Sequence, residues 1–217
     1  MPYWEGKMKS LILAILFMFM APVAVEASLE DVGKATCKVY AEEGTGTGVV
    51  FLENEDYYYV LTAAHVVYSR DGSLDDILEV EFFVNGFQSR KISATTDLAF
   101  FFPATTTDIA VLKIAKTDLG QYPKPSVIPL AESDEDIRRN DIILTYGCPQ
   151  GLWPSGQVGH INFYRSNGMI VEPYPTVGRS GSGVFDEEGQ KILGIVIWKT
   201  GMTVPAKKIR MLITGEM

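Results

Sequence analysis

The feature that most constrains the fold is a succession of short apolar, β-branched runs separated by Gly, Pro, Asn and Asp. Runs of this length and composition are typical of strands, and the residues between them are typical of turns. No helical period extends beyond about two turns until residues 206–212, near the C-terminus. The pattern therefore predicts an all-β barrel or sandwich architecture with a short C-terminal helix.

Two turn segments stand out in the N-terminal half. Asn85 and Gly86 lie between strand candidates at 78–84 and 87–93, and this pair is the strongest short hairpin signal in the chain. The segment 44–48, which reads GTGTG, predicts a flexible turn before a strand at 49–52.

A Pro-bearing segment divides the 217 residues into two β-rich halves. Pro123 and Pro125 cannot donate hydrogen bonds within a ladder, so they predict an extended connection. Strand candidates resume at 127–130. Two comparable halves suggest two domains with a cleft between them. The expected divisions are an N-terminal barrel over 28–116, a linker over 117–126, and a C-terminal barrel with the helix over 127–217.

Residues 1–27 have the composition of a secretory signal peptide. Two lysines precede an apolar run over 11–25, and Val25 to Ala27 resembles a small-x-small cleavage site. The run is shorter than the roughly 20 residues that a membrane span needs, so we expect cleavage and a secreted or periplasmic protein. Because Glu26 lies inside the cleavage site, an uncleaved membrane anchor stays as the alternative.

The composition excludes several function classes. A net charge of −8 argues against nucleic acid as a partner, because phosphates attract basic surfaces. It gives no attraction to anionic lipid, so no stable membrane partner is expected unless the N-terminal segment is retained. The chain lacks a clustered His/Cys ligand set, so no metal or organic cofactor is implied. Export would make Cys37 and Cys148 eligible for a disulfide, and two separate buried thiols are the alternative.

Three polar residues stand at the ends or turns of apolar runs. His65 ends the run VLTAAH, and Asp108 heads the run DIAVLKI. Ser180 lies in a Gly/Ser turn between Gly178 and Gly181, where the backbone has the freedom that close approach of a substrate requires. Each of these residues alone is common at the end of a strand or in a turn, but the three together, in this order along the chain, suggest a functional site.

Four segments in this order resemble trypsin-like serine proteases of the chymotrypsin fold, with the nearest likeness to the bacterial HtrA-type and glutamyl-endopeptidase-like branches. GTGTGVVF resembles their first-barrel strand, VLTAAHVV the histidine strand, TDIAVLKI the aspartate strand, and GRSGSGVFDEEGQKILGIV the serine turn. The resemblance covers residues 34–212. It implies two six-stranded antiparallel β-barrels, hydrolysis of protein or peptide substrates, and no cofactor. A PDZ module is not expected.

By this resemblance, Ser180 is the nucleophile, His65 the general base and then acid, and Asp108 the group that orients the imidazole. The backbone N–H groups of Gly178 and Ser180 are expected to form the oxyanion hole. The residues expected to line the primary specificity pocket are Tyr174, Pro175, Val196, Trp198 and Lys199. No substrate preference is predicted, because Lys199 stands where a glycine commonly opens the pocket.

Several alternatives stay open. Asp97 is also followed by an apolar residue and alanine, but Asp108 is preferred because its segment is the fuller match. His160 is interpreted as structural, with a role in substrate binding as the alternative. A catalytically silent binding protein on the same scaffold and a G-x-S-x-G esterase are the rival functions. Arg179 precedes the serine where animal digestive members carry an aspartate that pairs with a newly cut N-terminus, so that zymogen switch is not expected. The oligomeric state is not predicted.

Overall fold

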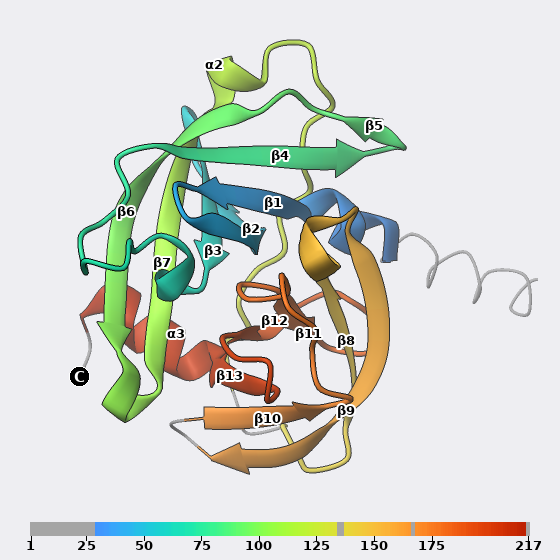
Figure 1. The fold of residues 1–217 in the computed structure, drawn as a ribbon. Coiled ribbons are helices and arrows are strands. Elements are labelled where there is room, and N and C mark those ends of the chain that lie inside the picture. Colours follow the sequence, from blue (N-terminus) through green and yellow to red (C-terminus); the bar gives the residue numbers. More distant parts are fainter. Residues whose placement is uncertain (1–28, 134–136, 166–167, 216–217) are drawn as a thin grey trace, which may run out of the picture.

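The computed structural model describes residues 29–133, 137–165 and 168–215, so the signal peptide predicted over 1–27 lies outside the described residues. The described strands form two six-stranded antiparallel β-barrels, and a short helix follows near the C-terminus, as the sequence predicts. Figure 1 shows the first barrel, coloured blue to green, above the second barrel, coloured orange to red.

The first barrel is a sheet in the order β1-β2-β3-β7-β6-β4, closed by the pairing of β1 with β4, and β5 extends it beyond β4. A helical segment at 29–35 precedes it. Its strands are β1 (Thr36–Ala41), β2 (Gly44–Glu53), β3 (Tyr57–Thr62), β4 (Leu78–Val84), β5 (Phe87–Gln88), β6 (Ile92–Phe102) and β7 (Thr107–Ala115). The hairpin predicted at Asn85 and Gly86 is confirmed, because both residues have positive φ and Val84 pairs with Phe87 across them.

The turn predicted at 44–48 is wrong, because these residues form the first half of β2. The glycines serve close packing instead of a bend. A Cβ atom on Gly48 would lie 2.5 Å from Val60 Cγ1 and 3.0 Å from Cys37 Sγ. A side chain at this position would therefore collide with the barrel interior, which the sequence alone does not reveal.

The second barrel is closed in the order β10-β13-β12-β11-β8-β9. Its strands are β8 (Ile142–Gly147), β9 (Ser155–Arg165), β10 (Gly168–Glu172), β11 (Gly183–Phe185), β12 (Ile192–Val196) and β13 (Met202–Pro205). Between the barrels, the short helix α2 (Lys116–Leu119) leads into an irregular segment. The strand predicted at 127–130 is wrong, since Leu130 makes one isolated bridge to Ile192 and the rest is irregular.

Buried apolar side chains form three clusters, one inside each barrel and one between the barrels. Strand β7 contributes to two of them. Ala110, Leu112 and Ile114 face the interior of the first barrel, while Ile109 and Val111 pack in the cluster that joins the barrels. A strand with both faces buried carries a nearly continuous apolar run, which accounts for the sequence that follows Asp108.

The C-terminal helix α3 (Ala206–Thr214) packs on β12 and β13 and buries Ala206 and Ile209. Lys208 Nζ donates a 2.6 Å hydrogen bond to the carbonyl of Thr105, in the turn η2 (Pro103–Thr105) that precedes β7. The helix therefore ties the second barrel to the loop before Asp108. Within the described part of the chain, no helix combines the length and the apolar character needed to cross a membrane.

We expect Gly48→Ala to lower the free energy of unfolding by about 1–3 kcal/mol, because the added methyl group overpacks the barrel interior. Gly44→Ala is the matched control in the same strand, since a Cβ there meets nothing within 4 Å, and its change should stay below about 0.5 kcal/mol. Urea unfolding of both variants measures the difference. Equal stability of the two variants would contradict the packing assigned to Gly48.

Candidate active site

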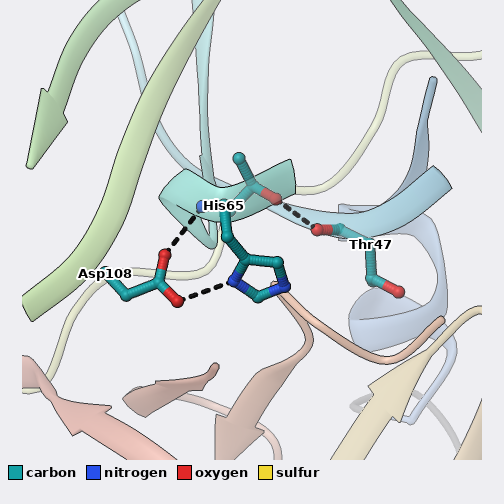
Figure 2. Close-up of polar contacts among 4 residues, drawn as sticks. Thr47, His65 and Asp108 are labelled. Carbon is teal, nitrogen blue, oxygen red and sulfur yellow. Dashed lines mark hydrogen bonds and ion pairs between the residues drawn. The ribbon is translucent and has the colours of Figure 1, made fainter. Parts of the chain in front are cut away.

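His65 and Asp108 lie side by side on the first barrel. His65 lies on the 3-10 turn η1 (Ala64–Val66), just after β3, and Asp108 is the second residue of β7. Because β3 pairs with β7, with Thr62 opposite Ala110, the end of β3 meets the start of β7. His65 Nδ1 lies 2.6 Å from Asp108 Oδ2, and the His65 backbone N–H donates to Oδ1 at 2.8 Å (Figure 2).

These two contacts fix the orientation of the imidazole. The Asp108 side chain is 1% exposed, and both of its oxygens accept hydrogen bonds from His65, so the buried carboxylate is compensated. An ionised carboxylate at Nδ1 favours the tautomer that carries its proton there. The other ring nitrogen, Nε2, lies on the side of the ring away from Asp108 (Figure 2). That nitrogen is then an unprotonated acceptor, as a general base requires.

The structure separates the other titratable candidates from this pair. Asp97 is exposed at an irregularity in the β6–β7 register, and its carboxylate forms no hydrogen bond or ion pair with another described residue. His160 lies on β9 in the second barrel, with Nε2 3.7 Å from Glu172 Oε2. Of the two histidines and two candidate aspartates, His65 and Asp108 are therefore the pair that the fold joins.

Ser180 lies in the turn between β10 and β11 and shares two cavities with His65. The smaller cavity has a volume of about 290 Å³ and the larger about 810 Å³. His65, Val177, Gly178 and Ser180 line both cavities. Among the described residues, Ser180 Oγ forms no hydrogen bond with His65 or with any other group. The fold brings the serine and the histidine to one cleft without joining them directly.

The backbone of residues 176–182, called here the serine turn, leaves two N–H groups free. The Val177 carbonyl accepts from Gln150 N at 2.7 Å, and the Arg179 carbonyl accepts from Ser182 N at 2.9 Å. In a trans peptide the next N–H points opposite to the carbonyl, so these bonds orient the N–H groups of Gly178 and Ser180. Neither N–H donates to an acceptor within the described segments. Both are therefore available to a ligand.

The conformation of the serine turn depends on Gly178. Its φ is +89°, and a Cβ atom there would lie 2.5 Å from the Cys148 carbonyl oxygen. The neighbouring Gln150, in the turn η3 (Pro149–Gly151), also has a left-handed φ of 54°. A non-glycine residue in this region is strained, and such strain is concentrated at functional sites. Sequence reasoning missed Gln150, because no glycine marks its conformation.

Thr47, on β2, connects the serine turn to the first barrel. Its N–H donates to the Ser180 carbonyl at 2.8 Å, and its Oγ1 donates to the Gly178 carbonyl at 2.9 Å. The same Oγ1 accepts from Cys148 N at 2.9 Å, and the Thr47 carbonyl accepts from Thr62 Oγ1 at 2.7 Å, a contact drawn in Figure 2. Sequence reasoning missed Thr47, because the local pattern placed it in a turn and the resemblance of its segment to a first-barrel strand gave it no role.

The smaller cavity is apolar with a cationic residue in its lining. Four of the five residues predicted for the specificity pocket line it: Pro175, Val196, Trp198 and Lys199. Tyr174 does not line it, and its side chain is 56% exposed. The Trp198 and His65 ring centroids lie 6.4 Å apart. Among its described lining residues, His65 and Lys199 alone carry ionisable side chains.

Both cysteines are free and fully buried. Burial raises the pKa of Cys148 to about 11 and raises that of Cys37 well above its usual value. A thiol with a raised pKa is a poor nucleophile at neutral pH, so the structure does not favour either cysteine as a nucleophile. In residues 29–133, 137–165 and 168–215, no three His, Cys, Asp or Glu side chains gather in a group that could hold a metal ion.

Two barrels with a His–Asp pair on one and a glycine-flanked serine on the other define the double-barrel serine protease class of fold. The family model described as a trypsin-like peptidase domain matches residues 46–195. The chain therefore belongs to the trypsin-like peptidase family. A search of curated protein sequences found no match.

Solved structures of proteases share the fold at low sequence identity. The inactive form of the Rv3671c protease of Mycobacterium tuberculosis is 18% identical, with 88% of this chain and 91% of that chain covered and a TM-score of 0.62. Deg5 is 17% identical, with 89% of this chain and 96% of that chain covered and a TM-score of 0.68. The serine endoprotease from Yersinia pestis is 21% identical, with 88% of this chain and 65% of that chain covered and a TM-score of 0.67.

We expect Asp108→Asn to lower kcat/KM for an unfolded protein substrate by about 10⁴-fold, because an amide at this position stabilises the wrong imidazole tautomer. Asp97→Asn is the matched control and should stay within about 2-fold of wild type, as an exposed surface change. Hydrolysis of fluorescein-labelled casein measures both variants. A large loss in Asp97→Asn with activity kept in Asp108→Asn would reverse the assignment of the acid.

We expect Thr47→Val to lower the free energy of unfolding by about 1–3 kcal/mol, because it leaves the buried Cys148 N–H and Gly178 carbonyl unpaired. Thr47→Ser keeps the hydroxyl and should retain most of that stability. Thermal and urea unfolding of the two variants give the comparison. If serine proved as damaging as valine, the lost methyl group, and not the hydroxyl bridge, would be the cause.

Proposed function

We propose that this protein is a secreted or periplasmic serine endopeptidase that cleaves protein or peptide substrates through an acyl-enzyme on Ser180. The observation that carries the proposal is the His65–Asp108 pair, with Nδ1 2.6 Å from the carboxylate and Nε2 on the opposite side of the ring. A histidine held in this way has the tautomer that accepts a proton from a serine hydroxyl.

The proposed reaction uses residues from both barrels. His65 Nε2 takes the proton of Ser180 Oγ as the oxygen attacks the carbonyl carbon of the substrate, and it then gives that proton to the leaving amine. A water molecule, activated by the same nitrogen, releases the acyl group. The free N–H groups of Gly178 and Ser180 stabilise the oxyanion, and losing one such donor costs about 3–4 kcal/mol of transition-state stabilisation.

The absence of a hydrogen bond between Ser180 Oγ and His65 is compatible with this chemistry. Catalytic hydrogen bonds are often long or poorly aligned without substrate, and they tighten in the complex. Both residues line the same two cavities, so the fold places them in one cleft.

The two cavities support cleavage within a polypeptide. The smaller, of about 290 Å³, takes the side chain on the acyl side of the cleaved bond, and the larger, of about 810 Å³, takes the residues on the leaving-group side. Ser180 and His65 line both, so a chain that occupies both passes over the nucleophile. Secretion is supported by the signal-peptide pattern of residues 1–27 alone.

Labelling with a fluorophosphonate probe tests the nucleophile. We expect wild type to be labelled and Ser180→Ala to lose the label, because the probe forms a bond only with an activated serine oxygen. Ser182→Ala is the matched control in the same turn, since the Ser182 hydroxyl is fully buried and has no hydrogen-bond partner in the described structure. It should retain the label.

Two outcomes would contradict the proposal. Equal labelling of wild type and Ser180→Ala would remove the assigned nucleophile. A folded wild type that is not labelled and does not hydrolyse casein would favour a catalytically silent binding protein on this scaffold.

A further inference from the structure

Arg179, between the two residues whose N–H groups are free, is a buried cation without an acidic partner. Its side chain is 4% exposed, and none of the described Asp or Glu side chains forms an ion pair with it. One guanidinium nitrogen, Nη2, donates to both the carbonyl oxygen and the hydroxyl of Ser155, each at 2.9 Å. The other, Nη1, is buried with no partner in the described structure.

Packing alone does not account for a guanidinium in this place. Burial lowers the pKa of Arg179 from its ordinary value, because the charged form loses its hydration. An apolar side chain of similar length would fill the same space without this desolvation cost and without an orphaned donor. The two hydrogen bonds to Ser155 are therefore the feature that distinguishes Arg179 from an apolar residue, which could not form them.

Those bonds connect the serine turn to the first residue of β9. The backbone of Arg179 is already held within the turn, since its N–H donates to the Thr176 carbonyl at 3.2 Å and its carbonyl accepts from Ser182 N. Both contacts are internal to the turn and would move with it. The Arg179 side chain anchors the turn to a strand of the barrel, where Ser155 pairs with Gly147 of β8.

Arg179 shares a peptide unit with one of the two N–H groups expected to bind the oxyanion. The Arg179 carbonyl and the Ser180 N–H belong to the same planar peptide unit, so a rotation of Arg179 changes the direction of that N–H. Displacement of a catalytic group by about 1 Å can cost about 10²-fold in rate. Small movements of this peptide therefore affect catalysis more than they affect substrate binding.

We infer that Arg179 is a positioning residue, whose hydrogen bonds to Ser155 hold the peptide that presents the Ser180 N–H to the oxyanion. This inference rests on the proposed endopeptidase function. It assigns to β9 a part in catalysis, although β9 contributes no residue to the lining of either active-site cavity.

Arg179→Lys tests the inference, because lysine keeps the charge but lacks the planar guanidinium whose Nη2 reaches both Ser155 oxygens. We expect the rate of fluorophosphonate labelling and kcat for casein to fall by about 10- to 10²-fold, with KM changed by less than about 3-fold. Ser155→Ala keeps Arg179 and one of the two acceptors, so its loss should be smaller, about 3- to 10-fold. The pH at half-maximal activity should not move, because neither variant changes the net charge beside His65.

Arg210→Lys is the matched control. Arg210 lies on α3, outside the cavity linings, and its Nη1 is likewise buried without a partner in the described structure. It should keep wild-type rates whatever its effect on stability. Rates are expressed per folded molecule, so a purely structural role for Arg179 would lower the melting temperature and leave them unchanged.

The outcomes separate the inference from the function on which it rests. Wild-type labelling rates in folded Arg179→Lys, or in Ser155→Ala if the lysine variant does not fold, would overturn the role of Arg179 and leave Ser180 as the nucleophile. A wild type that is not labelled at Ser180 would overturn both. A rate loss in Arg210→Lys equal to that in Arg179→Lys would also overturn the role.

Discussion

The serine turn belongs to the second barrel, yet two of its carbonyl groups are held by one residue of the first. Thr47 donates from its backbone to Ser180 and from its hydroxyl to Gly178, across the surface where the barrels meet. His65 and Asp108 are fixed on the first barrel by the pairing of β3 with β7. These few polar contacts fix the position of the serine turn relative to His65 and Asp108. The apolar cluster between the barrels holds the two barrels together.

Two buried charged side chains near the site, Asp108 and Arg179, differ in how fully they are hydrogen-bonded. Asp108 has both oxygens satisfied by His65, so its burial is compensated and its charge orients the imidazole. Arg179 has one nitrogen satisfied by Ser155 and another without a partner. An incompletely satisfied buried charge weakens stability, and natural proteins accept such costs mainly at functional sites.

Much of the fold could be predicted because alternation and turn chemistry are local signals. The run after Asp108 reads as a strand because both its faces are buried, and Asn85 with Gly86 specifies a hairpin. The segment 44–48 was misassigned because glycine indicates a turn locally, whereas here Gly48 admits Val60 and Cys37 from neighbouring strands. That reason is a tertiary contact, which composition does not contain.

The sequence names the candidate residues of the site, but it does not show the contacts that orient them. The motifs around His65, Asp108 and Ser180 indicate the chemistry of a serine protease. The choice of Asp108 over Asp97 gains a structural basis only from the strand pairing, which places Asp108 beside the histidine. The directions of the Gly178 and Ser180 N–H groups depend on backbone hydrogen bonds from Gln150 and Ser182. No sequence pattern marks those backbone contacts, since any residue type can make them.

A crystal structure of the protein with a peptidyl boronate tests the central claim most directly, because boron forms a tetrahedral adduct that mimics the transition state. The account predicts boron bonded to Ser180 Oγ, one boronate oxygen within hydrogen-bond distance of the N–H groups of Gly178 and Ser180, His65 Nε2 beside the adduct, and the Thr47 contacts intact. Boron bonded elsewhere, or an adduct on Ser180 whose oxygens approach neither N–H group, would contradict it.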